Sequence, residues 1–186
     1  MKRFFDGVNL LLALTMVVFA LWGWPRLPHE IPVHFGIDGR PDAWGERTVG
    51  SWFMIPGLGL ALTLGMGWFR RMLPRRPGCV NLPDKTKLSD LPVVARGPVV
   101  EMLAGFLALV QTEVLVIFLL IQFSTFRGAM GQDSRGIMIL VLLIAILSSP
   151  FFLVVFFLRL QGAMDRATAL AEGADVYDGA EPLRNL

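Results

Sequence analysis

Residues 25–47 read PRLPHEIPVHFGIDGRPDAWGER, a polar stretch that lies between two long apolar runs. Four prolines fix φ repeatedly within it and prevent a continuous helix. They are Pro25, Pro28, Pro32 and Pro41. A flexible linker would not contain so many prolines and aromatic residues, so we predict a compact, structured loop.

The middle of this loop carries the signals of a hairpin. Residues 31–36 alternate enough to form a short strand, and Asp38-Gly39 is a favoured hairpin turn pair. We therefore predict a small hairpin, with Phe35 and Trp44 packed beneath it.

The rest of the chain has the composition of a membrane protein. Of its 186 residues, 54% are hydrophobic and only 17% are charged. Apolar runs of about 18 to 20 residues with few or no charges are typical of transmembrane helices. Four such runs occur, at about residues 8–24, 51–69, 99–123 and 137–158. We predict an all-α integral membrane fold over residues 1–186, a single domain of four transmembrane helices with the hairpin between the first and second.

The connections predict the orientation of the chain. The loop at 25–50 and the turn after the third run hold five lysines and arginines, whereas the termini and the basic loop at 70–98 hold twelve. Basic residues accumulate on the cytoplasmic side, which predicts cytoplasmic termini and a hairpin outside the cell membrane. Residues 159–186 then form a cytoplasmic tail, helical at first and loosely ordered from about residue 174.

Several functional classes receive no support from the sequence. The basic residues flank apolar runs and form no base-stacking surface, so we expect no nucleic-acid partner. Cys79 is the single cysteine, which excludes an intrachain disulfide and zinc-type spacing. No nucleophile elbow, phosphate-binding loop, dinucleotide fingerprint or zincin helix occurs. We expect neither a cofactor nor an enzyme.

The loop holds most of the candidate binding residues. A histidine titrates near neutrality and can bind ligands or metals, which makes His34 the centre of this set. The candidate ligand-binding residues are His34, Phe35, Asp38, Asp42, Trp44 and, from the third run, Glu113. Weak metal-ligand candidates are His29, Glu30 and His34. The favoured alternative is structural: His34 bonds the loop backbone, and the aspartates cap turns.

Glu113 is unusual because it lies inside an apolar run. A charge at that depth costs about 2.5 to 3.5 kcal/mol on insertion scales, so it normally faces the bundle interior or a wet cavity. It either forms the floor of a pocket beneath the hairpin, close to His34, or is a structural carboxyl group. Its partners would then be Gln111 or a hydroxyl such as that of Thr15, Thr63 or Ser148.

Two further sets concern the lipid bilayer. Small residues at Gly57, Ala61 and Gly65 are spaced to let another helix approach closely, which predicts helix packing. The arginines after the second run are topology determinants that also suit anionic lipid headgroups. They are Arg70, Arg71, Arg75 and Arg76.

The loop resembles the motif of a bacterial membrane-protein family, domain of unknown function 1648. The motif comprises a Leu-Pro pair, Ile-Pro-x-His-Phe, then Gly-x-Pro-Asp and a nearby Trp-Gly. The matching residues are Leu27, Pro28, Ile31, Pro32, His34, Phe35, Gly39, Pro41, Asp42, Trp44 and Gly45. Residues 81–85 also resemble an Asn-x-Pro-Asn-Lys element of relatives, with Asp84 in place of the second asparagine.

This resemblance implies a location and a role. It implies the cytoplasmic membrane of a bacterium, and a relation to the SdpI-like proteins, which protect bacteria from a membrane-active toxin peptide and take part in signalling. We expect the hairpin to bind or sense a ligand or peptide outside the cell. The alternatives are a structural subunit that contacts another membrane protein, or, less favoured, a metal-dependent membrane enzyme or small transporter built on His34 and Glu113.

Overall fold

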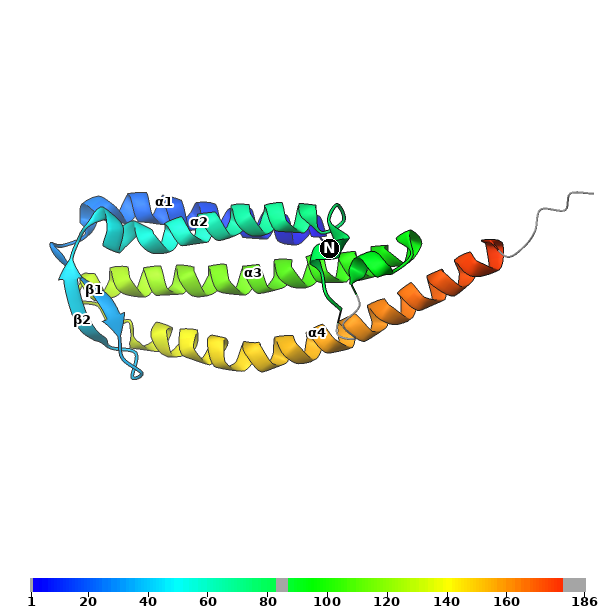
Figure 1. The fold of residues 1–186 in the computed structure, drawn as a ribbon. Helices are drawn as coiled ribbons and strands as arrows, with labels where there is room; N and C mark the ends of the chain where they lie inside the picture. The colour runs from blue at the N-terminus through cyan, green and yellow to red at the C-terminus, as the bar shows by residue number, and fades with distance from the viewer. Residues whose placement is uncertain (1, 83–86, 179–186) are drawn as a thin grey trace, which may run out of the picture. The chain divides into compact units, whose positions relative to one another are not determined.

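The computed structural model describes residues 2–82 and 87–178 (Figure 1). Most of the element predicted at 81–85, and the end of the tail at 179–186, lie outside the described residues. Four helices carry the fold: α1 (Lys2–Gly23), α2 (Val49–Met72), α3 (Val93–Ala129) and α4 (Arg135–Asp178).

Each of the four helices is long and apolar enough to cross a membrane. The predicted fold class, four membrane helices with a small hairpin between the first two, is confirmed. The chain is therefore a membrane protein.

The helices extend beyond the apolar runs from which they were predicted. Helix α3 begins at Val93 and continues through Pro98, while α4 continues to Asp178. Residues 174–178, expected to be loosely ordered, are therefore helical. An apolar run marks only the part of a helix that suits hydrocarbon, whereas each added residue beyond it still gains a backbone hydrogen bond.

The chain groups into two compact units. The first comprises Met1–Gly67 with Ala108–Phe152, and the second comprises Trp68–Leu107 with Leu153–Leu186. Helices α2, α3 and α4 each contribute residues to both units. The hairpin and Glu113 belong to the first unit, and the basic loop belongs to the second.

In the second unit the basic loop packs on helices. Two 3₁₀ turns, η2 (Pro77–Cys79) and η3 (Leu88–Asp90), shape it, and Leu88 is fully buried in a cluster with Val99 and Ala163. Of the four arginines that the sequence assigned to lipid headgroups, Arg70 is buried. The other three, Arg71, Arg75 and Arg76, are exposed.

The first unit is tied together by polar contacts between helices. Asn9 Nδ2 donates to the carbonyl oxygen of Ala108 at 3.1 Å, and Thr112 Oγ1 donates to Asn9 Oδ1 at 2.7 Å. The indole N–H of Trp52 donates to the carbonyl oxygen of Ala20 at 2.8 Å. Such bonds join α1 to α3 and to α2 in a medium that offers few competing partners.

Close packing inside the first unit uses a glycine different from those predicted. A Cβ atom at Gly59 would lie 3.0 Å from the Met16 methyl carbon and 3.3 Å from Leu115. Gly57, Ala61 and Gly65 are exposed instead, and a Cβ atom at Gly57 or Gly65 would have no neighbour within 4 Å among the described residues. Their predicted packing is therefore not made inside this unit, because they lie on a different face of α2 from Gly59.

The hairpin follows a short 3₁₀ turn, η1 (Trp24–Arg26), and lies where α1 ends and α2 begins (Figure 1). Its strands, β1 (Glu30–Phe35) and β2 (Pro41–Glu46), pair antiparallel, with an irregular register around His34. At the turn, Gly39 has φ +77° and donates its N–H to the carbonyl oxygen of Gly36 at 2.9 Å. Glycine suits this left-handed conformation, which other residues adopt at a cost.

Candidate functional site

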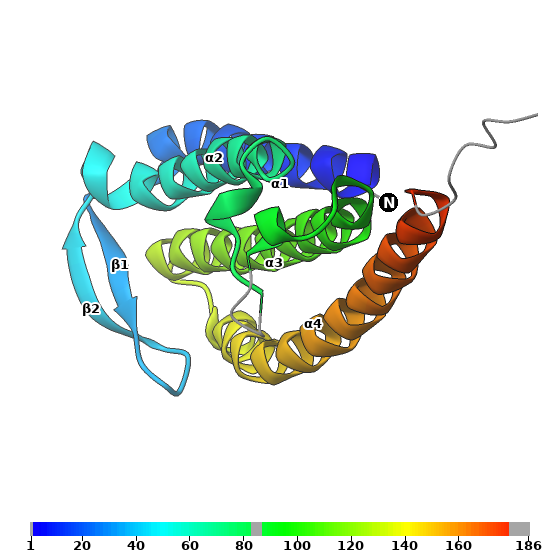
Figure 2. The ribbon, with the colours of Figure 1, turned by 45° about the vertical axis from the view of Figure 1, so that its right-hand side comes forward.

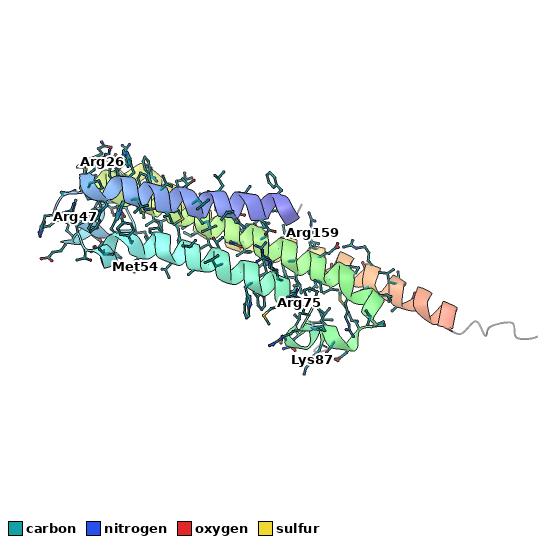
Figure 3. All side chains as sticks on the ribbon, turned by 90° about the horizontal axis from the view of Figure 1, so that it is seen from above. Arg26, Arg47, Met54, Arg75, Lys87 and Arg159 are labelled. Carbon is teal, nitrogen blue, oxygen red and sulfur yellow. The ribbon has the colours of Figure 1, made fainter. Side chains whose placement is uncertain are left out.

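The base of the hairpin is fastened by Arg47. Its Nη1 donates to the carbonyl oxygens of Trp24 at 3.1 Å and of Leu27 at 2.7 Å, while its guanidinium group lies 4.8 Å from the Trp24 ring centre. Its backbone N–H donates to the carbonyl oxygen of His29 at 2.7 Å. Figure 3 shows Arg47 at the end of α2 that lies next to the hairpin. One side chain thus joins both ends of the loop.

The inner side of the hairpin packs on the helices. Ile31 is fully buried and Leu27 is 5% exposed, in a cluster with Trp52 and Ala20. Trp44, expected beneath the hairpin, is instead 50% exposed. The expectation was wrong for Trp44, because Ile31 and Pro32 of β1 make the inner contacts instead.

Two glycines let the hairpin contact the ends of α3 and α4. A Cβ atom at Gly128 of α3 would lie 2.9 Å from Cγ of Pro32 and 3.4 Å from Cγ of Pro41. A Cβ atom at Gly39 would lie 2.7 Å from the carbonyl oxygen of Arg135, at the start of α4. Figures 1 and 2 show the turn of the hairpin beside this end of α4. The hairpin is therefore held at its base, its middle and its turn.

The outer side of the hairpin carries an exposed polar pair. Nδ1 of His34 lies 2.5 Å from Oδ1 of Asp42, and the two side chains are 68% and 51% exposed. The structure thus brings together two candidates that lie on different strands. Because Asp42 occupies Nδ1, Nε2 is the ring nitrogen left for a ligand. The half-exposed indole of Trp44 lies on the same strand as Asp42.

The other loop candidates have structural roles. Oδ1 of Asp38 accepts the backbone N–H of Arg40 at 3.1 Å, which caps the turn as the alternative interpretation predicted. Phe35 is half-buried and pairs with Pro41 across the strands.

The weak metal candidates do not form a ligand set with one another. Glu30 faces Glu46 across the strands, and His29 is exposed. Over residues 2–82 and 87–178, no three histidine, cysteine or acidic side chains come close enough together to hold a metal ion.

Glu113 contacts α4. Its carboxyl group is hydrogen-bonded to Oγ of Ser148, one of the three hydroxyls considered, and Ser148 Oγ also lies 2.6 Å from the carbonyl oxygen of Ile144. The Ser148 hydroxyl group thus lies between the Glu113 carboxyl group and the backbone of its own helix. The other two hydroxyls, of Thr15 and Thr63, donate to carbonyl oxygens in their own helices.

Sequence reasoning missed Arg47, Gly128 and Arg135 as parts of this site. Arg47 had a readable signal, since an arginine directly after the hairpin can reach the carbonyl oxygens at its start. Gly128 and Arg135 had none, because they lie far along the chain from the loop that they contact.

Comparison with known proteins supports the sequence resemblance. A search of the curated proteins gives no match, and a search of the solved structures gives none. A comparison with protein-family models does give a match, but neither the matched family nor the helical architecture indicates a catalytic activity. Residues 11–60, which span most of α1, the hairpin and the start of α2, match the model of the family "Domain of unknown function (DUF1648)".

Proposed function

We propose that this chain is a bacterial cytoplasmic-membrane protein whose hairpin binds or senses a ligand or peptide outside the cell. One observation carries the proposal: the hairpin is fixed against the helices and leaves the side chains of His34, Asp42 and Trp44 exposed. A protein that needed this segment only as a connection between helices would require neither the fixed seat nor the exposed pair.

The distribution of charge supports the orientation. Twelve of the seventeen lysines and arginines lie in residues 2–3, 70–98 and 159–186, and the other five lie in residues 25–50 and 124–136. Positive residues favour the cytoplasmic side, so the hairpin faces outward. In that orientation Arg71, Arg75 and Arg76 lie at the cytoplasmic surface, exposed towards anionic lipid headgroups.

The chemistry of the outer side favours a peptide. Trp44 offers a large apolar contact of the kind that contributes strongly to binding. Asp42 and the facing pair Glu30 and Glu46 are exposed acidic groups that suit a cationic partner. This agrees with the immunity or envelope-signalling roles that the resemblance to SdpI-like proteins implies.

A challenge with membrane-active bacterial peptides tests the proposal. Bacteria that lack the gene would be given wild type, Trp44→Ala or Asp42→Asn and exposed to a panel of such peptides. We expect wild type to raise the tolerated concentration of at least one peptide several-fold, and both variants to lose that gain.

Ala43→Ser is the matched control, because Ala43 is exposed on the same strand and lies between the two tested residues. Membrane immunoblots would establish equal amounts of each protein. No protection by wild type, or full protection by both variants, would contradict the proposed role of the hairpin.

The exposed small-residue face of α2 favours a second candidate function, an accessory subunit of a larger membrane complex. Gly57, Ala61 and Gly65 face away from the first unit, where another helix can approach closely. Gly65→Leu should then abolish co-purification of a partner from native membranes and leave the stability of the isolated chain unchanged. Leu64→Ala, at an exposed neighbouring position, is the control. Equal recovery from both variants would exclude this surface.

A further inference from the structure

The turn of the hairpin carries an apolar residue, Ile37, whose side chain is almost fully exposed. Ile37 is 93% exposed, the highest value among the large hydrophobic side chains of the described residues. It occupies the first central position of the turn closed by Gly36 and Gly39. Single exposed apolar residues are common on protein surfaces, so exposure alone does not indicate a function for Ile37. Its position in the fold is the more informative observation.

That position is beside a membrane helix. Two residues after Ile37, a Cβ atom at Gly39 would lie 2.7 Å from the carbonyl oxygen of Arg135 and 3.3 Å from Cγ1 of Ile139. Both belong to the first turns of α4, so the turn of the hairpin lies alongside the start of that helix. In Figures 1 and 2 the turn reaches the start of α4 in both views.

The neighbouring face of α4 already suits lipid. Ile139, Leu140 and Leu143 are 37%, 47% and 49% exposed, and α4 is apolar enough to span the bilayer. The exposed surface of Ile37 is thus next to a surface whose occupant is lipid. Burial of an isoleucine side chain in an apolar medium is favourable, and at this level the medium is the boundary between headgroups and acyl chains.

Two cations lie where lipid phosphates would be. Arg40 follows the turn with its side chain 67% exposed, and Arg135 is exposed at the start of α4. Arginines and apolar residues side by side at a helix end are typical of a membrane interface. Of the acidic groups in the turn, Asp38 accepts the backbone N–H of Arg40 and lies 3.8 Å from its Nε, and Asp42 contacts His34.

We propose that the turn of the hairpin is a lipid anchor, in which Ile37 inserts into the interfacial layer beside α4 while Arg40 and Arg135 contact phosphates. The occupant of this surface is the bilayer, and not a second copy of the chain or another protein. The anchor fixes the height of the hairpin above the membrane and requires no ligand. The anchor requires only that the hairpin lies at the membrane surface where α4 begins. It does not require that this surface is the outer one.

Site-directed spin labelling tests the proposal on the full chain. Cys79 would be replaced by serine, and a nitroxide attached to Ile37→Cys or, as a control, to Ala43→Cys. Both proteins would be reconstituted in vesicles of phosphatidylcholine and phosphatidylglycerol. Ala43 is a matched control because it is exposed on the same hairpin, away from the turn.

Oxygen concentrates in the acyl layer, and a water-soluble nickel chelate concentrates in water. We expect the ratio of oxygen to nickel accessibility to be several-fold higher at residue 37 than at residue 43. An equal ratio at the two positions would overturn the anchor, because residue 37 would then lie no deeper in the membrane than residue 43. Protection of residue 37 from both reagents would overturn it as well, since a protein surface would then cover the turn.

A second measurement covers the case in which the nitroxide itself disturbs the turn. A bimane fluorophore on Ile37→Cys should be quenched more strongly by lipids brominated near the headgroup than by lipids brominated near the end of the chain. Quenching by neither lipid would contradict the proposal even if the first experiment supported it.

Discussion

Gly39 and Arg135 approach so closely that a single added carbon between them would clash: a Cβ atom at Gly39 would lie 2.7 Å from the Arg135 carbonyl oxygen. The contact joins the turn between β1 and β2 to the first residue of α4, far along the chain. The hairpin is thereby a fixed part of the first unit and not a mobile connection between α1 and α2.

Gly39→Ala should destabilise the protein strongly. Its left-handed backbone alone makes a side chain cost about 1 to 2 kcal/mol, and the clash with a backbone atom adds to that cost. Gly131→Ala is a matched control, because Gly131 has φ +69° and a Cβ atom there would have no neighbour within 4 Å among the described residues. Thermal unfolding in detergent should show a clearly larger loss for residue 39. Equal losses would mean that the contact with Arg135 contributes nothing.

Gly128→Ala tests the contact between α3 and the prolines of the hairpin. The new carbon would lie 2.9 Å from Cγ of Pro32, a rigid ring, and overpacking of this kind costs about 1 to 3 kcal/mol. Gly105→Ala in the same helix meets open space and should instead stabilise by up to about 1 kcal/mol through helix propensity. The melting temperatures of the two variants should therefore move in opposite directions. A rise in both would show that the prolines do not rest on α3.

Glu113→Gln should be tolerated better than Glu113→Ala. The amide group of glutamine keeps an oxygen that can accept the hydrogen of the Ser148 hydroxyl group, whereas alanine offers no acceptor. A double-mutant cycle of Glu113→Ala with Ser148→Ala, followed by unfolding in detergent, should give a coupling of about 0.6 kcal/mol and at most about 1.7 kcal/mol. Zero coupling would show that the two side chains do not interact in the protein.

The orientation can be tested with the native cysteine. Cys79 is exposed in the loop between α2 and α3, so in the proposed orientation it should resist an impermeant thiol reagent on intact cells and react after permeabilisation. Ala43→Cys, combined with Cys79→Ser, should react on intact cells because residue 43 is exposed on the hairpin. The opposite labelling pattern would place the hairpin in the cytoplasm and remove the proposed function.

The hairpin and the four helices could be predicted because their signals are local. Proline spacing and the Asp38-Gly39 pair specify the turn, and uncharged runs of sufficient length specify membrane helices. The ends of α3 and α4 could not be read in this way. An apolar run ends where the hydrocarbon ends, and a helix such as α4 continues to Asp178 through polar residues.

The candidate site was predicted only in part. His34 and Asp42 were both named as candidates, but their pairing depends on the irregular register of β1 and β2. Trp44 is half-exposed, against expectation. The contacts of Gly128 and Arg135 depend on where α3 and α4 end in space, which no pattern within residues 25–47 encodes.

The contact between Pro32 and Gly128 also has a consequence for the order of synthesis. The ribosome completes residues 25–47 long before it reaches the end of α3 and the start of α4, so the inner side of the hairpin is made before the surfaces that it rests on. A chain interrupted after α2 would lack the part of α3 on which the buried Pro32 rests. The hairpin can make all of its contacts only in a chain whose last two helices have been inserted. The presence of these contacts therefore indicates that all four helices are in place.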